Sequence, residues 1–166
     1  MNISEALDYI HSVNWVFCKP GLDRIRTLCE ALGNPQDKLT FIHVAGTNGK
    51  GSFCAMTESI LRAEGFCTGL FTSPYITCFN ERMKVNGENI SDEELIALVE
   101  EVRPIADAME DRPTEFELIT AIGLLYFKNM GDFMNNYTSE LSELNKQNQE
   151  LKNTLYDVEV RIGHNL

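Results

Sequence analysis

Residues 39–52, with the sequence LTFIHVAGTNGKGS, constrain the fold of this chain more than any other segment. The segment begins with a β-branched and aromatic run, typical of a buried strand, and ends in three glycines, a lysine and a serine. A helix-compatible segment, residues 53–64, follows. A strand, a glycine-rich turn and a helix in this order can hold phosphate, because backbone N–H groups, the helix N-terminus and a lysine all favour anionic oxygens. The segment therefore predicts a nucleotide-phosphate site centred on Lys50.

The glycine-rich turn departs from the strict P-loop pattern, which needs glycine six residues before the lysine and Ser or Thr directly after it. Those positions hold Val44 and Gly51, so a P-loop GTPase or kinase is disfavoured. A plain turn that binds nothing is the alternative, with Thr47 and Asn48 stabilising it. The candidate phosphate-binding residues are Gly46, Thr47, Asn48, Gly49, Lys50, Gly51 and Ser52.

Composition limits the class of protein. A chain of 166 residues suits one domain with a real core. The net charge of −11 disfavours nucleic acid and membrane surfaces as partners. No signal peptide or membrane-spanning run is predicted. The cysteines form no CxxC pair, which favours a reduced, cytoplasmic protein; they are Cys18, Cys29, Cys54, Cys67 and Cys78.

Helices and strands alternate in the predicted order. Helices are predicted over residues 4–11, 22–32, 53–64, 92–109 and 115–127, strands over 39–45 and 66–72, and a long loop over 75–87. Capping boxes at residues 91–94 and 114–117 mark two of the helix starts. Strand–helix–strand order with short joins predicts an α/β fold with a parallel sheet.

Two further candidate ligands lie where loops follow strands or open helices. Ser73 follows the strand over residues 66–72, and Glu117 opens a later helix; hydroxyl and carboxylate oxygens near phosphates suit Mg²⁺. Each has a structural alternative: Ser73 as a turn residue before Pro74, and Glu117 as the capping-box glutamate. Arg82 either forms an exposed ion pair with Glu81 or binds an anionic ligand in bidentate fashion.

Several motifs in order resemble one enzyme family. HVAGTNGKGS, LFTSPY, FNERMKVNG and PTEFELITAIGLLYF, together with KPGLDRIRTLCEALGNP, are similar to the start of folylpolyglutamate synthase, which is often bifunctional with dihydrofolate synthase and belongs to the Mur ligase superfamily. The resemblance covers about residues 1–133. It implies an incomplete Mur ligase-like ATPase domain with a P-loop-type parallel sheet flanked by helices.

The resemblance also implies an activity: ATP-dependent addition of L-glutamate to folate or dihydropteroate through an acyl phosphate. Residues 46–52 would hold ATP, with Lys50 as the catalytic residue that counters charge during phosphoryl transfer. Ser73 and Glu117 match positions that hold Mg²⁺ in the family, and Tyr75 stands where a histidine is frequent. The implied folate-loop residues are Thr72, Ser73, Pro74, Tyr75, Phe79 and Arg82.

The resemblance ends near Phe133. The family's metal-binding histidine, a catalytically important lysine and the C-terminal domain have no counterpart in residues 134–166. We therefore expect little or no turnover by this chain alone.

The tail, residues 134–166, carries a heptad pattern. A single polar residue, Asn148, lies in the seam, which favours a defined coiled-coil homodimer through residues 137–162. An amphipathic helix packed on its own domain is the alternative. The predicted domains are thus 1–133 and 134–166, and the rival function is a dimeric interaction protein with a vestigial nucleotide-binding module. The seam residues are Leu141, Asn148, Leu155 and Ile162 at a, and Tyr137, Leu144, Leu151 and Val158 at d.

Overall fold

The computed structural model describes residues 1–12 and 20–163, without the side chains of residues 137, 151 and 153–163. Cys18 and part of the KPGL motif therefore lie outside the described residues. Two compact units are present, Met1–Met130 and Gly131–Leu166, and each is described by itself. No described helix is long and apolar enough to cross a membrane.

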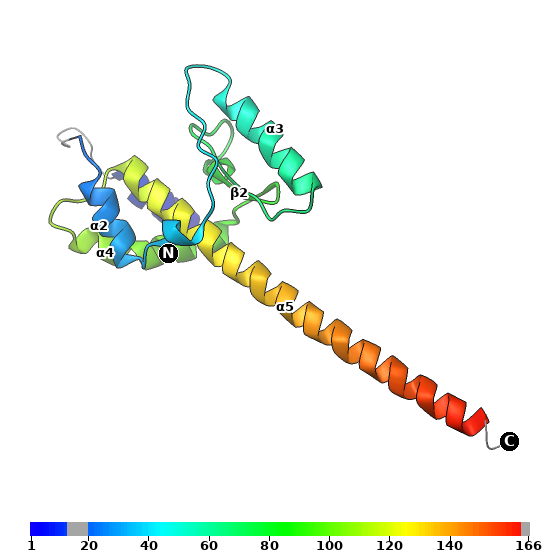
Figure 1. The fold of residues 1–166 in the computed structure, drawn as a ribbon. Coiled ribbons are helices and arrows are strands. Elements are labelled where there is room, and N and C mark those ends of the chain that lie inside the picture. The colour runs from blue at the N-terminus through cyan, green and yellow to red at the C-terminus, as the bar shows by residue number, and fades with distance from the viewer. Residues whose placement is uncertain (13–19, 164–166) are drawn as a thin grey trace. The chain divides into compact units, whose positions relative to one another are not determined.

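Helices form the core of the first unit (Figure 1). Helices α1 (Ile3–Ser12) and α2 (Asp23–Ala31) both contact α4 (Asp92–Ala108). Their apolar faces pack with the first turns of α5 (Glu115–Gly163), because the apolar residues recur at helical spacing. The fully buried side chains include Ile10, Leu28, Leu95, Val99, Val102, Leu118 and Ile122.

The two predicted capping boxes explain where α4 and α5 begin. At α4, the Ser91 hydroxyl accepts a hydrogen bond from the Glu94 backbone N–H (3.2 Å), and the Glu94 carboxylate accepts one from the Ser91 N–H (2.9 Å). Such reciprocal caps satisfy two N–H groups that the helix itself cannot. The prediction of both boxes is confirmed, because the signal depends on residues only three positions apart.

The sheet of the described residues is small and antiparallel. Strands β1 (Gly69–Phe71), β2 (Met83–Val85) and β3 (Glu88–Asn89) pair in the order β1-β2-β3. Asn86 and Gly87 join β2 to β3 with φ of 51° and 87°, as a tight hairpin turn requires. The predicted loop over residues 75–87 thus contains a strand and a 3-10 turn, Phe79–Arg82.

The predicted parallel sheet is not confirmed. Residues 39–45 form no strand, and the side chains of Phe41 and Ile42 are 56% and 62% exposed. A parallel strand is stable only when neighbouring strands pair with its backbone and helices cover its faces. Among the described residues no strand pairs with this segment. Its high strand propensity is therefore not enough to make it a β-strand.

Helix α5 extends far beyond the predicted end at residue 127. It continues past Phe133, where the family resemblance ends, and reaches Gly163. In the second unit the side chains of Leu141 and Leu144 are 41% and 53% exposed. The tail is therefore helical, as the heptad pattern predicted, while its dimerisation stays a prediction.

Candidate functional site

The glycine-rich loop leads directly into α3 (Lys50–Ala63). Gly49 caps this helix with φ of 76°, a left-handed conformation that side chains with a β-carbon rarely adopt. All residues from 46 to 52 are exposed. The loop therefore presents itself to solvent at the positive end of a 14-residue helix, which is the geometry that favours anions.

Lys50, the first residue of α3, folds back over this loop. Its Nζ donates to the carbonyl oxygens of Gly46 (2.6 Å) and Thr47 (3.1 Å). The ammonium group is thus held beside the loop rather than extended into solvent. A phosphate bound by the loop would meet this charge at short range.

Arg82 organises the predicted folate loop. Its side chain is buried, and its Nη1 donates to the Ser73 hydroxyl at 2.8 Å. The guanidinium carbon lies 5.0 Å from the ring centre of Tyr75 and 5.4 Å from that of Phe79, within cation–π range. The structure therefore places three of the predicted folate-loop residues, Ser73, Tyr75 and Phe79, around the guanidinium of a fourth, Arg82.

The Nε of Arg82 is buried and has no hydrogen-bond partner. This donor is unusual, because buried polar groups are almost always paired. Arg82 also lines a hollow of about 360 Å³ at the start of α5. The other lining residues are Thr114, Glu115, Phe116 and Ile119.

The loop between Thr72 and Arg82 is also held by hydrogen bonds to its backbone, two of which involve the carboxylate of Glu81. Its carboxylate accepts hydrogen bonds from the backbone N–H groups of Ile76 (2.9 Å) and Thr77 (3.1 Å), which lower the pKa of Glu81. The Thr72 N–H donates to the Arg82 carbonyl at 3.0 Å. Glu81 thus stabilises the loop backbone, and among the described ion pairs none joins it to Arg82.

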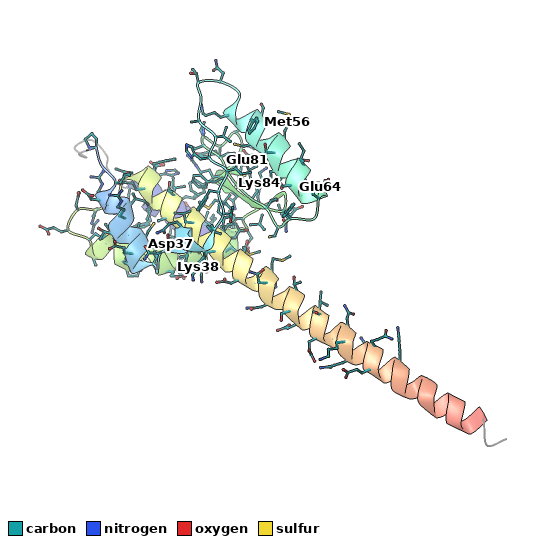
Figure 2. All side chains as sticks on the ribbon, viewed as in Figure 1. Asp37, Lys38, Met56, Glu64, Glu81 and Lys84 are labelled. Carbon is teal, nitrogen blue, oxygen red and sulfur yellow. The ribbon has the colours of Figure 1, made fainter. Side chains whose placement is uncertain are left out.

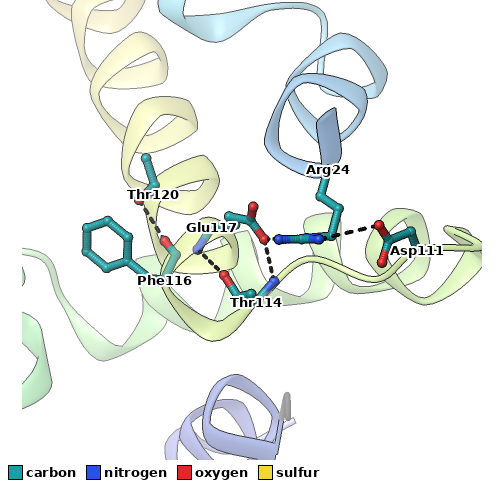
Figure 3. Close-up of polar contacts among 6 residues, drawn as sticks. All are labelled: Arg24, Asp111, Thr114, Phe116, Glu117 and Thr120. Atoms are coloured by element: carbon teal, nitrogen blue, oxygen red, sulfur yellow. Dashed lines mark hydrogen bonds and ion pairs between the residues drawn. The ribbon is translucent and has the colours of Figure 1, made fainter. Parts of the chain in front are cut away.

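Glu117 belongs to a different network, shown in Figure 3. Its Oε2 accepts hydrogen bonds from the Thr114 N–H (2.7 Å) and from Nε of Arg24 (2.9 Å), a buried residue of α2. Nη1 of Arg24 also lies 3.4 Å from Asp111. Burial opposes ionisation of Glu117, but the hydrogen bonds from Arg24 and Thr114 outweigh it and lower the pKa of the carboxyl group.

These contacts do not fit the magnesium site expected at Ser73 and Glu117. Each of the two side chains accepts a hydrogen bond from an arginine, and a divalent cation placed there would be repelled by that guanidinium. The capping-box role of Glu117 is the one that the geometry supports.

Sequence reasoning missed Arg24 and the α5 residues that line the hollow. Arg24 comes from a helix more than 90 positions away from Glu117, and no local pattern links the two. The sequence pattern marks Thr114 and Phe116 only as part of a capping box. Their position beside Arg82 depends on the packing of distant segments.

Comparison with known proteins identifies the relatives of the N-terminal part of the chain. A curated dihydrofolate synthase/folylpolyglutamate synthase of Bacillus subtilis is 48% identical over 127 residues, which are 74% of this chain and 30% of that protein. The apo form of Lacticaseibacillus casei folylpolyglutamate synthase superposes with a TM-score of 0.75 at 42% identity, over 79% of this chain and 33% of that one. A complex of folylpolyglutamate synthase with AMPPCP and folate gives 0.76 and 41% over the same shares.

A scan against models of known protein families gives no match. The chain spans about a third of the length of the relatives it matches. The described helices and small antiparallel sheet occur in the N-terminal region of these ligases. The N-terminal part of this chain is thus similar in sequence and fold to the N-terminal region of folylpolyglutamate and dihydrofolate synthases.

Proposed function

We propose that this chain carries the nucleotide-binding front part of a ligase that adds L-glutamate to folate or dihydropteroate at the expense of ATP. The observation that carries the proposal is the exposed glycine-rich loop at the N-terminus of α3, with the Lys50 ammonium 2.6 Å from the loop carbonyl of Gly46. The structural relative in complex with AMPPCP and folate supports ATP as the nucleotide.

The glycine-rich loop would bind the triphosphate through its backbone N–H groups and the positive charge of Lys50. In the proposed reaction a substrate carboxylate attacks the γ-phosphorus of ATP, and ADP leaves. The amine of L-glutamate then attacks the acyl phosphate, forming an amide and releasing phosphate. N–H groups at the start of α3 would orient the phosphates, and Lys50 would exchange its carbonyl contacts for phosphate oxygens and stabilise the developing charge.

Magnesium is expected with ATP, because triphosphates in kinases and ligases are usually bound as the magnesium complex. Ser73 and Glu117, the expected ligands, do not fit that role as they are arranged, since both oxygens face an arginine. The proposal therefore routes no step through a metal at these residues.

We propose the Arg82 cluster as the folate or dihydropteroate side of the site. Tyr75 supplies aromatic surface beside the guanidinium, and the buried ring of Phe79 contacts the same cation from the core. The adjacent hollow at the start of α5 has the exposed ring of Phe116 in its wall. Planar heteroaromatic ligands favour such surroundings because rings and cations can both contact their faces.

Turnover is expected to need more than this chain. The relatives are about three times as long, and we expect the rest of such a ligase to contribute residues to the reaction. Nucleotide binding tests the proposal without turnover. ATP and ADP should bind to the chain and adenosine should not, as measured by calorimetry, because the loop recognises phosphate; equal affinity for adenosine would contradict the proposal.

A second candidate function is self-association through residues 137–162. The tail is one continuous helix, and its described seam residues Leu141 and Leu144 are substantially exposed. Exposed leucines at a and d positions are typical of helices that pair with a second copy. A dimer would then present two copies of the nucleotide-binding unit.

The compartment stays a prediction. Cys29, Cys54, Cys67 and Cys78 are free thiols. Free thiols suit a reducing environment such as the cytoplasm.

A further inference from the structure

A carboxylate occupies the buried position of helix α3. Among the described residues of this helix only Glu58 is buried, with 9% of its surface exposed. A buried carboxylate costs free energy unless hydrogen-bond donors pair with it. The partners of Glu58 therefore decide how α3 is held.

Two donors pair with Glu58, one from α3 and one from outside it. Its Oε1 accepts hydrogen bonds from the Thr68 hydroxyl (2.8 Å) and from Nε of Arg62 (3.2 Å), which lies about one turn further along α3. Thr68 is itself buried and directly precedes β1. The hydroxyl of Thr68 thus links α3 directly to the start of the small sheet.

The hairpin turn between β2 and β3 holds Thr68 in its turn. The Thr68 N–H donates to Oδ1 of Asn86 (2.9 Å), and the Asn86 N–H donates to the Thr68 carbonyl oxygen (2.9 Å). The guanidinium of Arg62 lies against the same turn, since a β-carbon added at Gly87 would be 3.2 Å from Cζ of Arg62. We call Glu58, Arg62, Thr68 and Asn86 the Glu58 network.

Apolar packing contributes little to holding α3. Phe53, Met56 and Ile60 are 52%, 59% and 64% exposed (Figure 2 labels Met56). No described residue of α3 belongs to the buried apolar core of the first unit. The position of α3 on the small sheet therefore depends largely on the Glu58 network.

The glycine-rich loop takes its position from the same helix. Gly49 caps α3 and Lys50 is its first residue, so the loop continues directly into the helix. On the other side of the loop, residues 39–45 form no strand. Glu58 lies about 12 Å from Lys50 along the helix axis. Because α3 is one continuous helix, an anchor at Glu58 also fixes the direction in which the N–H groups of the loop point.

We propose that Glu58 is a positioning residue for nucleotide binding. Its carboxylate, paired with Thr68 and Arg62, fixes α3 on the hairpin turn and keeps the glycine-rich loop in the geometry that binds phosphate. Glu58 itself does not touch the nucleotide. The inference rests on the proposed binding of ATP at residues 46–52 and adds a residue that acts on this site from about two helical turns away.

Substitution of Thr68 tests the inference without changing α3 itself. Thr68→Val keeps the size of the side chain but removes the hydroxyl donor, so the buried carboxylate loses a partner. We expect the affinity of this variant for Mg·ATP, measured by calorimetry, to be about fivefold lower than that of the parent, because hydrogen bonds to charged groups are among the stronger ones. Thr68→Ser restores the hydroxyl and should bind Mg·ATP with the affinity of the parent.

Substitution of Glu58 provides a second variant. Glu58→Gln removes the negative charge beside Arg62 at nearly the same volume, and it should also weaken ATP binding. Glu64→Gln is the matched control, because it removes an exposed charge at the end of the same helix (Figure 2). This control should bind ATP as the parent does.

Hydrogen exchange without nucleotide shows whether the effect is local to α3. In Thr68→Val and Glu58→Gln the amides of residues 54–63 should exchange faster than in the parent, while those of α4 should not change, because α4 is packed in the core. Saturating ATP should restore the protection of α3, since bound phosphate holds its N-terminus. A role in general stability alone would raise exchange in both helices.

Three results would overturn the role of Glu58 while the parent still binds ATP. Thr68→Val and Glu58→Gln could bind ATP as tightly as the parent, Glu64→Gln could weaken binding as strongly as Glu58→Gln, or exchange could rise equally in α3 and α4. A parent chain that binds no ATP would instead overturn the proposed function, and this inference with it.

Discussion

Nε of Arg24 lies 2.9 Å from Oε2 of Glu117 and thereby ties helix α2 to the first turn of α5. The same carboxylate oxygen accepts the N–H of Thr114, so one atom caps α5 and pairs with a buried cation. The relationship makes Glu117 a structural residue of the first unit. It also places a guanidinium where a metal ion had been expected.

The capping box at α5 should contribute measurably to stability. Thr114→Ala removes the hydroxyl that accepts the Glu117 N–H, and loss of such a cap costs about 1 kcal/mol. We expect the melting temperature of the chain to fall by about 2–4 °C. Thr120→Ala is a suitable control, because that hydroxyl only donates to a carbonyl within α5. An equal loss in both variants would contradict the capping role.

Replacing Glu117 with glutamine distinguishes a structural role from a metal-binding role. Glu117→Gln removes the negative charge that Nε of Arg24 contacts at 2.9 Å, so thermal unfolding without any ligand should occur at lower temperature. Affinity for Mg·ATP, measured by calorimetry well below that temperature, should change less than twofold. A large loss of magnesium-dependent affinity with unchanged unfolding would instead support a metal ligand.

The lowered pKa of Glu117 predicts a pH dependence of stability. A carboxyl group with a lower pKa in the folded state than its ordinary value of 4.5 stabilises the fold above that value. This contribution disappears as the pH falls through the folded-state pKa, because the protonated group no longer pairs with Arg24. Denaturant unfolding of the parent and Glu117→Gln should therefore differ at pH 7 and converge at lower pH; a constant difference across that range would exclude the ion pair as the cause.

Arg82 should not be replaceable by lysine. Its planar guanidinium contacts Ser73 and two aromatic rings at once, whereas an ammonium group is a compact point charge. We expect Arg82→Lys to destabilise the first unit by about 1–2 kcal/mol in denaturant unfolding. Lys84→Arg, a similar exchange in the adjacent strand β2, is the control and should have little effect (Figure 2).

The heptad assignment can be tested at one residue. Asn148→Leu should raise the helix melting temperature and produce mixed oligomeric states if position 148 is a buried a position. Light scattering on a size-exclusion column gives the mass, and circular dichroism gives the melt. A parent chain that is monomeric at tens of micromolar, or a variant with unchanged mass and melt, would remove the assignment.

Local features of this fold could be predicted from the sequence, and distant ones could not. Both capping boxes and the entry of the glycine loop into α3 depend on neighbouring residues, and all were found. The helix predicted over residues 115–127 continues through Gly131, although glycine costs a helix about 1 kcal/mol relative to alanine.

In the candidate site, too, local arrangements could be predicted from the sequence and contacts between distant residues could not. Gly49 and Lys50 act within one turn of helix, so their arrangement followed from the motif. The Arg24–Glu117 pair joins residues 93 positions apart, and only the packed helices bring them together. The strand predicted over residues 39–45 is not formed. A strand needs a second segment to pair with, and the apolar pattern of one segment does not show whether such a partner is present.

The most direct test of the phosphate site is calorimetric titration of the chain with Mg·ATP. Lys50→Ala removes the ammonium at the loop, and Lys38→Ala removes an equal charge from an exposed turn before it (Figure 2). We predict that the parent and Lys38→Ala bind ATP with equal affinity and that Lys50→Ala binds at least tenfold more weakly. Absence of binding by the parent, or equal binding by Lys50→Ala, would contradict the assignment of residues 46–52 as a nucleotide-phosphate site.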